Sequence, residues 1–166
     1  MPDPAPAARF PLQLRFGDID AYGHVNNATY FSYFEHARVQ LHQLPAGPAS
    51  PSGPVIRDLA GHGTFTLVAG QEIEYRAPLV LRPEPVYVDV WVTHVGGSSF
   101  RTGYTVAEQD RSAVYAIGAS TMVLVDRGGG HPVQLPEGYR AALRRFAGPE
   151  VPFRRPAQAQ DVRQEA

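Results

Sequence analysis

The sequence predicts one α+β domain in which a single long helix packs against an antiparallel β-sheet. Three observations lead to this prediction. A segment with helical periodicity follows a first strand, four strand-like segments come after the helix, and 166 residues are enough for one domain with its own core. One helix covers one face of such a sheet.

The first strand is expected at residues 10–16, where Phe10, Leu12, Leu14 and Phe16 fall on one face. The long helix is expected at 28–44, because apolar side chains recur there at three- and four-residue steps. Pro45 is consistent with the end of the helix. Asn26 or Asn27 is well placed as the N-cap residue, since its side-chain oxygen can accept an N–H of the first turn.

Four further strands are expected at about 63–77, 86–95, 100–108 and 113–125. The turn-forming segments 96–98 and 109–111 predict hairpins between them, and therefore an antiparallel meander. A short amphipathic helix is expected at 137–146. It is too short to cover the rest of the sheet, so we expect self-association into a homodimer or homotetramer.

The two ends of the chain differ in composition from its centre. Residues 1–9 are rich in Pro and Ala, and residues 148–166 are rich in Pro, Gln and Arg. We expect a disordered N-terminal tail at 1–9, the folded domain at 10–147 and a flexible C-terminal tail at 148–166.

Composition excludes several classes of function. The apolar fraction of 43% is that of an ordinary globular protein. The net charge of −1 gives no electrostatic reason to expect nucleic acid or an anionic membrane as a partner. The absence of cysteine excludes disulfides and thiolate chemistry. The sequence shows neither a signal peptide nor an apolar run of about 20 residues, so we expect a cytoplasmic protein.

The segment from Arg15 to Arg38 is the most informative part of the chain. An acidic, turn-rich loop with Asp18 and Asp20 lies directly before two Asn residues and the long helix. This order puts a carboxylate beside a helix N-terminus, where unpaired N–H groups can stabilise a developing oxyanion. A base or nucleophile beside an oxyanion site is the minimum equipment for acyl transfer.

The same segment contains the string GDIDAYGHVNNATYFSYFEHAR. It closely resembles the signature of the hotdog-fold acyl-CoA thioesterases of the 4-hydroxybenzoyl-CoA thioesterase family. The resemblance implies a hotdog fold, in which a curved antiparallel sheet of about five strands wraps a long central helix. It also implies hydrolysis of an acyl-CoA to a carboxylic acid and free CoA, with no cofactor.

Under this resemblance, Asp20 matches the catalytic carboxylate of the family. It would act as a nucleophile on the thioester carbonyl or as a general base toward water. The alternative is that Asp20 only orders the turn. Asn27 matches the position whose backbone N–H polarises the thioester carbonyl, whereas Asp18 is expected to be structural.

Five further residues are candidates for contact with substrate. His24 can pair with Asp20 or serve structural hydrogen bonding, and Asn26 can cap the helix. Tyr30 is expected in the core or along the cleft. In hotdog enzymes the region of Gly63 and Thr64 often lines the acyl end of the cleft.

Glu35 and Arg38 are three residues apart on the helix and are expected to form a structural ion pair.

Other kinds of site are not indicated. No His residues show metal-ligand spacing, the three glycines at 128–130 do not open a phosphate-binding loop, and no Gly-x-Ser-x-Gly motif is present. Candidates for contact with the CoA phosphates are Arg76, Arg82, Arg101 and Arg111. Two other functions stay open: a non-catalytic acyl-CoA-binding hotdog module, and a hotdog enoyl-CoA hydratase, whose residue constellation we do not find on this helix.

Overall fold

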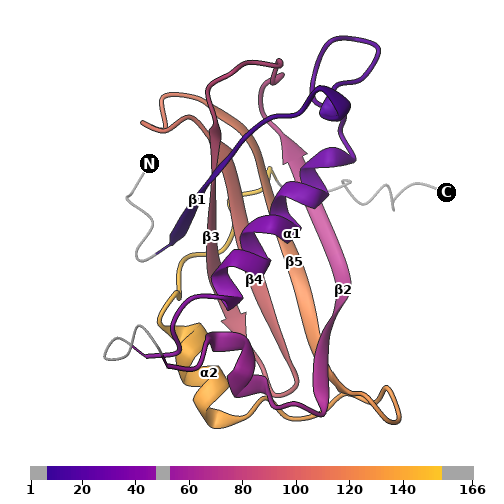
Figure 1. The fold of residues 1–166 in the computed structure, drawn as a ribbon, viewed down its shortest axis with the longest axis vertical. Helices are drawn as coiled ribbons and strands as arrows, with labels where there is room; N and C mark the ends of the chain where they lie inside the picture. The colour runs from indigo at the N-terminus through magenta and orange to yellow at the C-terminus, as the bar shows by residue number, and fades with distance from the viewer. Residues whose placement is uncertain (1–6, 48–52, 155–166) are drawn as a thin grey trace, which may run out of the picture.

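A computed structural model describes residues 7–47 and 53–154 of the chain. Its regular elements are β1 (Ala8–Leu12), α1 (Thr29–His42), β2 (Thr64–Tyr75), β3 (Val86–Val95), β4 (Ser99–Ala107), β5 (Val114–Asp126) and α2 (Glu137–Arg144). Two short 3-10 helices, η1 (Phe16–Asp18) and η2 (Ile56–Ala60), complete the set. Figure 1 shows α1 lying diagonally across one face of the sheet, and α2 lies near the C-terminal end of α1.

The five strands form one antiparallel sheet in the order β1-β3-β4-β5-β2. The two predicted hairpins join β3 to β4 and β4 to β5, so the meander over these three strands is confirmed. The strand β2 does not extend this meander beside β3. It pairs with β5 at the far edge, and β1 pairs with β3 at the other edge.

The first strand differs from the prediction of 10–16. Its ladder with β3 runs from the pair Ala8↔Val90 to the pair Leu12↔Val86, and β3 begins at Val86. No partner is left for residues beyond Leu12, and the chain turns into η1. Leu14 is still buried, whereas Phe16 is 86% exposed, so placing Phe16 on the inner face was wrong.

The main core lies between α1 and the sheet. The buried face of α1 (Tyr30, Tyr33, Phe34, Ala37 and Leu41) packs on the inward side chains of β3, including Val86, Val88 and Val90. The ring of Phe34 stacks on that of Tyr104 with centroids 4.6 Å apart. This close approach requires Gly118, since a Cβ there would lie 2.3 Å from Cε2 of Phe34.

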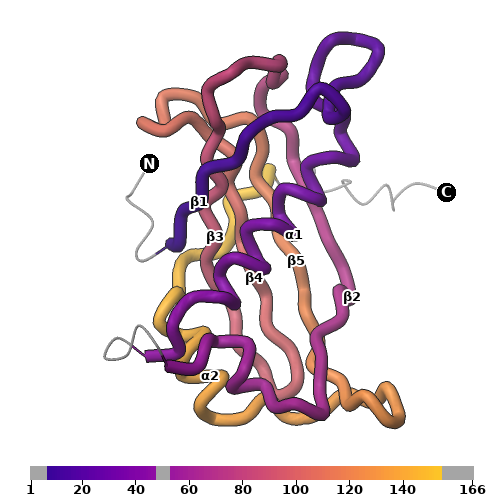
Figure 2. Tube along the Cα trace, in the orientation of Figure 1, coloured from indigo at the N-terminus to yellow at the C-terminus, as the bar shows by residue number. Residues whose placement is uncertain are grey.

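Part of the opposite face of the sheet is covered by the segment 147–154, which continues behind the sheet in Figure 2. Trp91 donates from Nε1 to the carbonyl of Pro149 at 2.7 Å. Val151 is buried in one hydrophobic cluster with Trp91, Ile117 and Ala119. Residues 148–154, expected in a flexible tail, therefore pack on the domain. Likewise Ala8 and Arg9 belong to β1, while residues 1–6 and 155–166 lie outside the described residues.

Candidate active site

The acidic loop folds into a small hairpin before α1. The backbone N–H of Asn26 donates to the carbonyl of Asp18 at 2.8 Å, and that of Asp20 donates to the carbonyl of His24 at 2.8 Å. Gly23 closes the turn with a φ of +81°, a conformation that glycine adopts without strain. The hairpin thus presents Asp20 and His24 opposite each other, next to the start of the helix.

The two carboxylates of the loop have different partners. Asp18 accepts two hydrogen bonds at Oδ2, from the Arg15 backbone N–H at 2.9 Å and from the Tyr33 hydroxyl at 2.8 Å. Burial, followed by this bond to Asp18, raises the pKa of Tyr33 and keeps its hydroxyl a donor. Asp18 therefore ties the loop to α1, the arrangement expected of a structural carboxylate.

Asp20 orders the turn through one oxygen. Its Oδ1 accepts the backbone N–H of Tyr22 at 2.8 Å and that of His24 at 3.4 Å. No donor among the described residues reaches Oδ2. The half-buried carboxylate thus combines a fixed orientation with an oxygen available to a ligand.

Asn26 and Asn27 lie directly before α1. Asn26 accepts the Ala28 N–H at Oδ1 (2.9 Å), and the Asn27 carbonyl accepts the Tyr75 hydroxyl (2.8 Å). The N-cap position is Ala28, which corrects the prediction that Asn26 or Asn27 occupies it. Within the described residues the N–H of Asn27, one residue before the N-cap, has no acceptor.

Tyr30 lies in the first turn of α1 and is buried beneath the loop. Its ring contacts those of Tyr75 and Tyr33, with centroids 5.4 Å and 5.7 Å away. Burial raises the pKa of Tyr30 to about 12, so its hydroxyl is neutral at physiological pH. In the single chain Tyr30 is a core residue.

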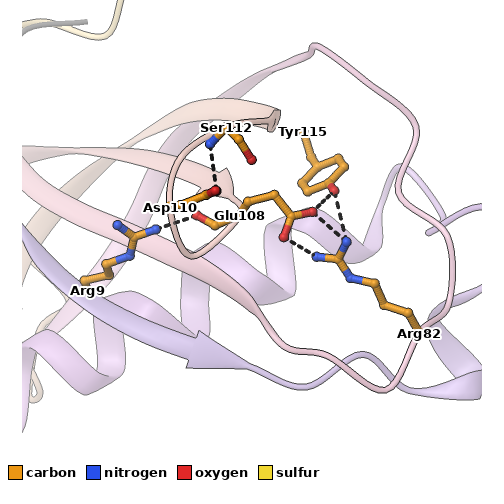
Figure 3. Close-up of polar contacts among 6 residues, drawn as sticks. All are labelled: Arg9, Arg82, Glu108, Asp110, Ser112 and Tyr115. Atoms are coloured by element: carbon orange, nitrogen blue, oxygen red, sulfur yellow. Dashed lines mark hydrogen bonds and ion pairs between the residues drawn. The ribbon is translucent and has the colours of Figure 1, made fainter.

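A polar cluster holds the segment on which the hairpin docks. The N–H of Val25 donates to the Leu79 carbonyl at 2.8 Å, and His24 forms an isolated bridge with Val80. A few residues on, Arg82 binds both carboxylate oxygens of Glu108 at 2.6 and 2.8 Å, as Figure 3 shows.

The same carboxylate accepts the Tyr115 hydroxyl, and Arg9 donates to the Glu108 carbonyl at 2.7 Å. The bond from Arg82, followed by the bond from Tyr115, lowers the pKa of Glu108. We call Arg82, Glu108 and Tyr115 the Glu108 clamp. It connects the ends of β4 and β5 to the segment that supports the acidic loop.

Gly63 and Thr64 lie far from this loop in the same chain. Tyr75, at one end of β2, contacts Asn27, whereas Thr64 begins the other end. Eleven residue steps along a strand span roughly 36 Å. A single chain therefore brings Asp20, His24, Asn26, Asn27 and Tyr30 together, but not Gly63 or Thr64.

The Thr64 end of β2 borders a cavity of about 740 Å³. The C-terminal half of α1, the 3-10 helix η2 and the beginning of β2 form its walls. We call it the α1–β2 cavity. A second cavity, of about 660 Å³, lies on the other side of α1 and is lined by Asp18, Tyr33 and Glu35 among others.

Three buried polar residues of the α1–β2 cavity were not predicted as site residues: Arg38, His42 and Tyr139. A signal was present in the sequence, because Arg38 and His42 follow Phe34 at four-residue steps and so share its helix face. The expected pair of Arg38 with Glu35 is present at 3.9 Å.

The four arginines proposed for the CoA phosphates are all engaged with carboxylates. Arg82 is in the Glu108 clamp, Arg76 pairs with Glu74 at 2.7 Å, Arg101 pairs with Glu72, and Arg111 pairs with Asp89 at 3.4 Å. Arg57 and Arg127 are more exposed and line the α1–β2 cavity.

Neither a metal-binding cluster nor a membrane-spanning helix occurs in the described part of the chain. Within 7–47 and 53–154, no group of three or more His, Asp or Glu side chains is arranged to hold a metal ion. No helix in these ranges is long and apolar enough to cross a membrane.

This chain is similar in sequence and in fold to known bacterial proteins. The uncharacterized protein YsmA of Bacillus subtilis (strain 168) is 28% identical over 126 residues, which cover 74% of this chain and 75% of YsmA. The PA5185 protein of Pseudomonas aeruginosa PAO1 superposes with a TM-score of 0.72 at 27% identity, covering 85% of this chain and 92% of that one.

A thioesterase from Thermus thermophilus, solved in complex with coenzyme A and Zn, is 31% identical. It superposes with a TM-score of 0.65 and covers 85% of this chain and 93% of that one. The predicted hotdog fold, with a long helix against a curved five-stranded antiparallel sheet, is confirmed by these likenesses. The model of the Thioesterase-like superfamily matches residues 14–143, and this chain therefore belongs to that superfamily.

Proposed function

We propose that this protein hydrolyses the thioester of an acyl-CoA to a carboxylic acid and free CoA. The observation that carries the proposal is the hairpin before α1. It holds Asp20 by one carboxylate oxygen and places it beside the start of a helix, where the N–H of Asn27 has no acceptor among the described residues.

In the proposed reaction the Asn27 N–H donates a hydrogen bond to the thioester carbonyl oxygen. This bond strengthens as negative charge develops on the oxygen, which lowers the barrier to attack. Asp20 either attacks the carbonyl carbon to give a mixed anhydride or removes a proton from the attacking water. His24, across the hairpin, and Asn26, whose side chain orders the helix start, position these two groups.

The proposed active unit contains two copies of the chain. The strand β2 is an edge of the sheet, and its Leu67 and Val68 are 48% and 44% exposed. Edge strands with exposed apolar side chains pair readily with another strand. Antiparallel pairing of two β2 strands about a two-fold axis would bring the Gly63–Thr64 end of one copy to the Asn27 end of the other.

This dimer would complete the site that one chain leaves divided. Each active site would combine Asp20, Asn27 and Tyr30 of one copy with Gly63 and Thr64 of its partner. The α1–β2 cavity borders Thr64, so it would open toward the partner's thioester site and receive the acyl group. CoA as the thiol carrier is favoured by the likeness to the thioesterase solved with coenzyme A.

The test is release of free thiol from a panel of aliphatic and aromatic acyl-CoAs. Asp20→Asn should lower turnover by about 10²–10⁴-fold while the protein stays folded. Asp126→Asn is a matched control, because Asp126 also accepts two backbone N–H groups in a turn, from Gly129 and His131. It should keep the wild-type rate.

Three results would contradict the proposal. Wild-type turnover by a folded Asp20→Asn protein would remove Asp20 from the mechanism. Acyl-CoA binding without thiol release would instead favour a binding module, and hydration of a 2-enoyl-CoA with the thioester left whole would favour a hydratase.

A further inference from the structure

Among the charged groups that line the α1–β2 cavity, one is buried. Arg38 projects from the middle of α1, and only 6% of its surface is exposed. No other arginine of the described residues is buried to this degree. Placing a cation away from water is unfavourable unless a partner compensates its charge. Arg38 therefore requires a group that compensates its positive charge.

A chain of buried hydroxyl groups fixes one side of the guanidinium. Arg38 donates from Nη1 to the Tyr104 hydroxyl at 3.2 Å, and that hydroxyl lies 2.7 Å from Oγ1 of Thr102. Thr102 in turn donates to the Ser120 carbonyl at 3.3 Å. These contacts orient the guanidinium but provide no negative charge.

Charge compensation within the chain is weak. Among the described residues, the one carboxylate within 4.0 Å of the Arg38 guanidinium is that of Glu35, at 3.9 Å from Nη2. This separation is too long for a hydrogen bond, and the Glu35 side chain is 67% exposed. A ligand carboxylate entering the cavity can take up the Arg38 donors without displacing a tight ion pair.

The neighbouring polar groups are neutral and already paired. Because a carbonyl can only accept, His42 donates from Nδ1 to the Arg38 carbonyl at 2.8 Å, and the Tyr139 hydroxyl then donates to Nε2 at 2.8 Å. Burial lowers the pKa of His42 and raises that of Tyr139, so both are uncharged near neutral pH. Arg38 therefore supplies the one buried positive charge of this wall.

We propose that the acyl group of the substrate ends in a carboxylate that binds Arg38 in the α1–β2 cavity. The substrates would then be monothioesters of dicarboxylic acids. The inference rests on the proposed thioesterase function and on the paired dimer, in which the partner's thioester site faces this cavity. A guanidinium matches a carboxylate with two parallel N–H donors, which a terminal methyl group cannot use.

The test compares pairs of substrates in the wild-type protein. Thiol release is measured for adipoyl-, suberoyl- and sebacoyl-CoA, each against the methyl-terminated acyl-CoA of the same length. A charged hydrogen-bonded contact of this kind predicts a kcat/KM about 10- to 100-fold higher for the best carboxylated substrate. Equal or faster turnover of every methyl-terminated partner would overturn the inference and leave the thioesterase function standing.

Variants locate the effect at Arg38. Arg38→Met should abolish the preference while hydrolysis of the methyl-terminated substrates continues. Arg38→Lys should keep part of the preference for carboxylated substrates. It replaces Arg38→Met in the test if Arg38→Met does not fold. Arg144→Met, which removes a half-exposed cation of α2, is the matched control and should keep the full preference. A preference that survives in folded Arg38→Met would also overturn the inference.

A binding measurement separates this inference from the reaction. The free dicarboxylic acids should raise the melting temperature of the wild type more than monocarboxylic acids of equal length do, and Arg38→Met should remove that difference. This result would support the carboxylate site even if no thiol were released. The absence of thiol release would then refute only the thioesterase function. Equal shifts for both classes of acid would count against the site.

Discussion

Gly118 of β5 lies against the ring of Phe34 of α1, and replacing it with alanine should push the helix away from the sheet. The new Cβ would lie 2.3 and 2.6 Å from two ring carbons of Phe34, and 3.0 Å from the Glu72 carbonyl oxygen. Carbon atoms in contact are ordinarily about 3.5–4.0 Å apart. Phe34 would therefore have to move by more than about 1 Å, yet its ring is stacked on Tyr104.

Overpacking of this kind costs about 1–3 kcal/mol. Because the clash involves a ring confined between two elements, we expect the upper part of this range. A loss of about 3 kcal/mol corresponds to a fall in Tm of about 6–12 °C for a protein of this size. Thermal unfolding followed by circular dichroism measures it.

Gly138 is the matched control for this substitution. It lies in α2, and a Cβ added there would have nothing within 4 Å, so Gly138→Ala should leave Tm unchanged or raise it through better helix propensity. The two substitutions thus have opposite expected signs. Gly118→Ala with a wild-type Tm would refute the close packing of α1 on the sheet.

Three further predictions concern assembly, the loop support and pH. Val68→Lys, at the exposed edge of β2, should weaken dimerisation by at least about tenfold, because it places two charges in a paired edge; an unchanged dimer by analytical ultracentrifugation would contradict the assembly. Glu108→Gln should lower the free energy of unfolding by about 1–3 kcal/mol in urea denaturation, since Arg82 loses its carboxylate. His42 has a lowered pKa in the folded state, so its contribution to stability is complete above about pH 6.5 and is lost as the pH falls below that value. His42→Gln should flatten this pH dependence of Tm, and an equally steep profile would count against a neutral buried imidazole.

Much of the fold follows from local periodicity. In β3 the four valines 86, 88, 90 and 92 alternate with other residues, and all four face the core as this alternation predicts. The helical period likewise placed α1 within about two residues of its ends. These signals are local, because the side-chain direction of a strand or helix depends on residue spacing alone.

Other features depend on partners that are distant in the sequence. The end of β1 is set by where β3 begins, which nothing near Phe16 encodes. Trp91 is buried because the segment 147–154 covers it, and a composition rich in Pro gave no sign of this packing. The α1–β2 cavity could not be predicted either, because Arg38 and Tyr139 meet there from separate helices.

In the candidate site, too, some features follow from local sequence and others depend on residues that are distant in the sequence. The family resemblance and the residues themselves place Asp20 beside a helix start, and the hairpin has this arrangement. The separation of Gly63 and Thr64 from Asp20 within one chain follows from the antiparallel course of β2, which only the sheet order reveals. The role in substrate binding that we propose for them therefore requires the proposed second copy.

The most direct test is a crystal structure with an acyl-CoA analogue in which a methylene group replaces the sulfur. The analogue keeps the carbonyl group but cannot be hydrolysed. The carbonyl oxygen should accept a hydrogen bond from the Asn27 N–H, with a carboxylate oxygen of Asp20 facing the carbonyl carbon or a water beside it. A carbonyl bound elsewhere, such as in the cavity beside Asp18 and Tyr33, would contradict the proposed mechanism.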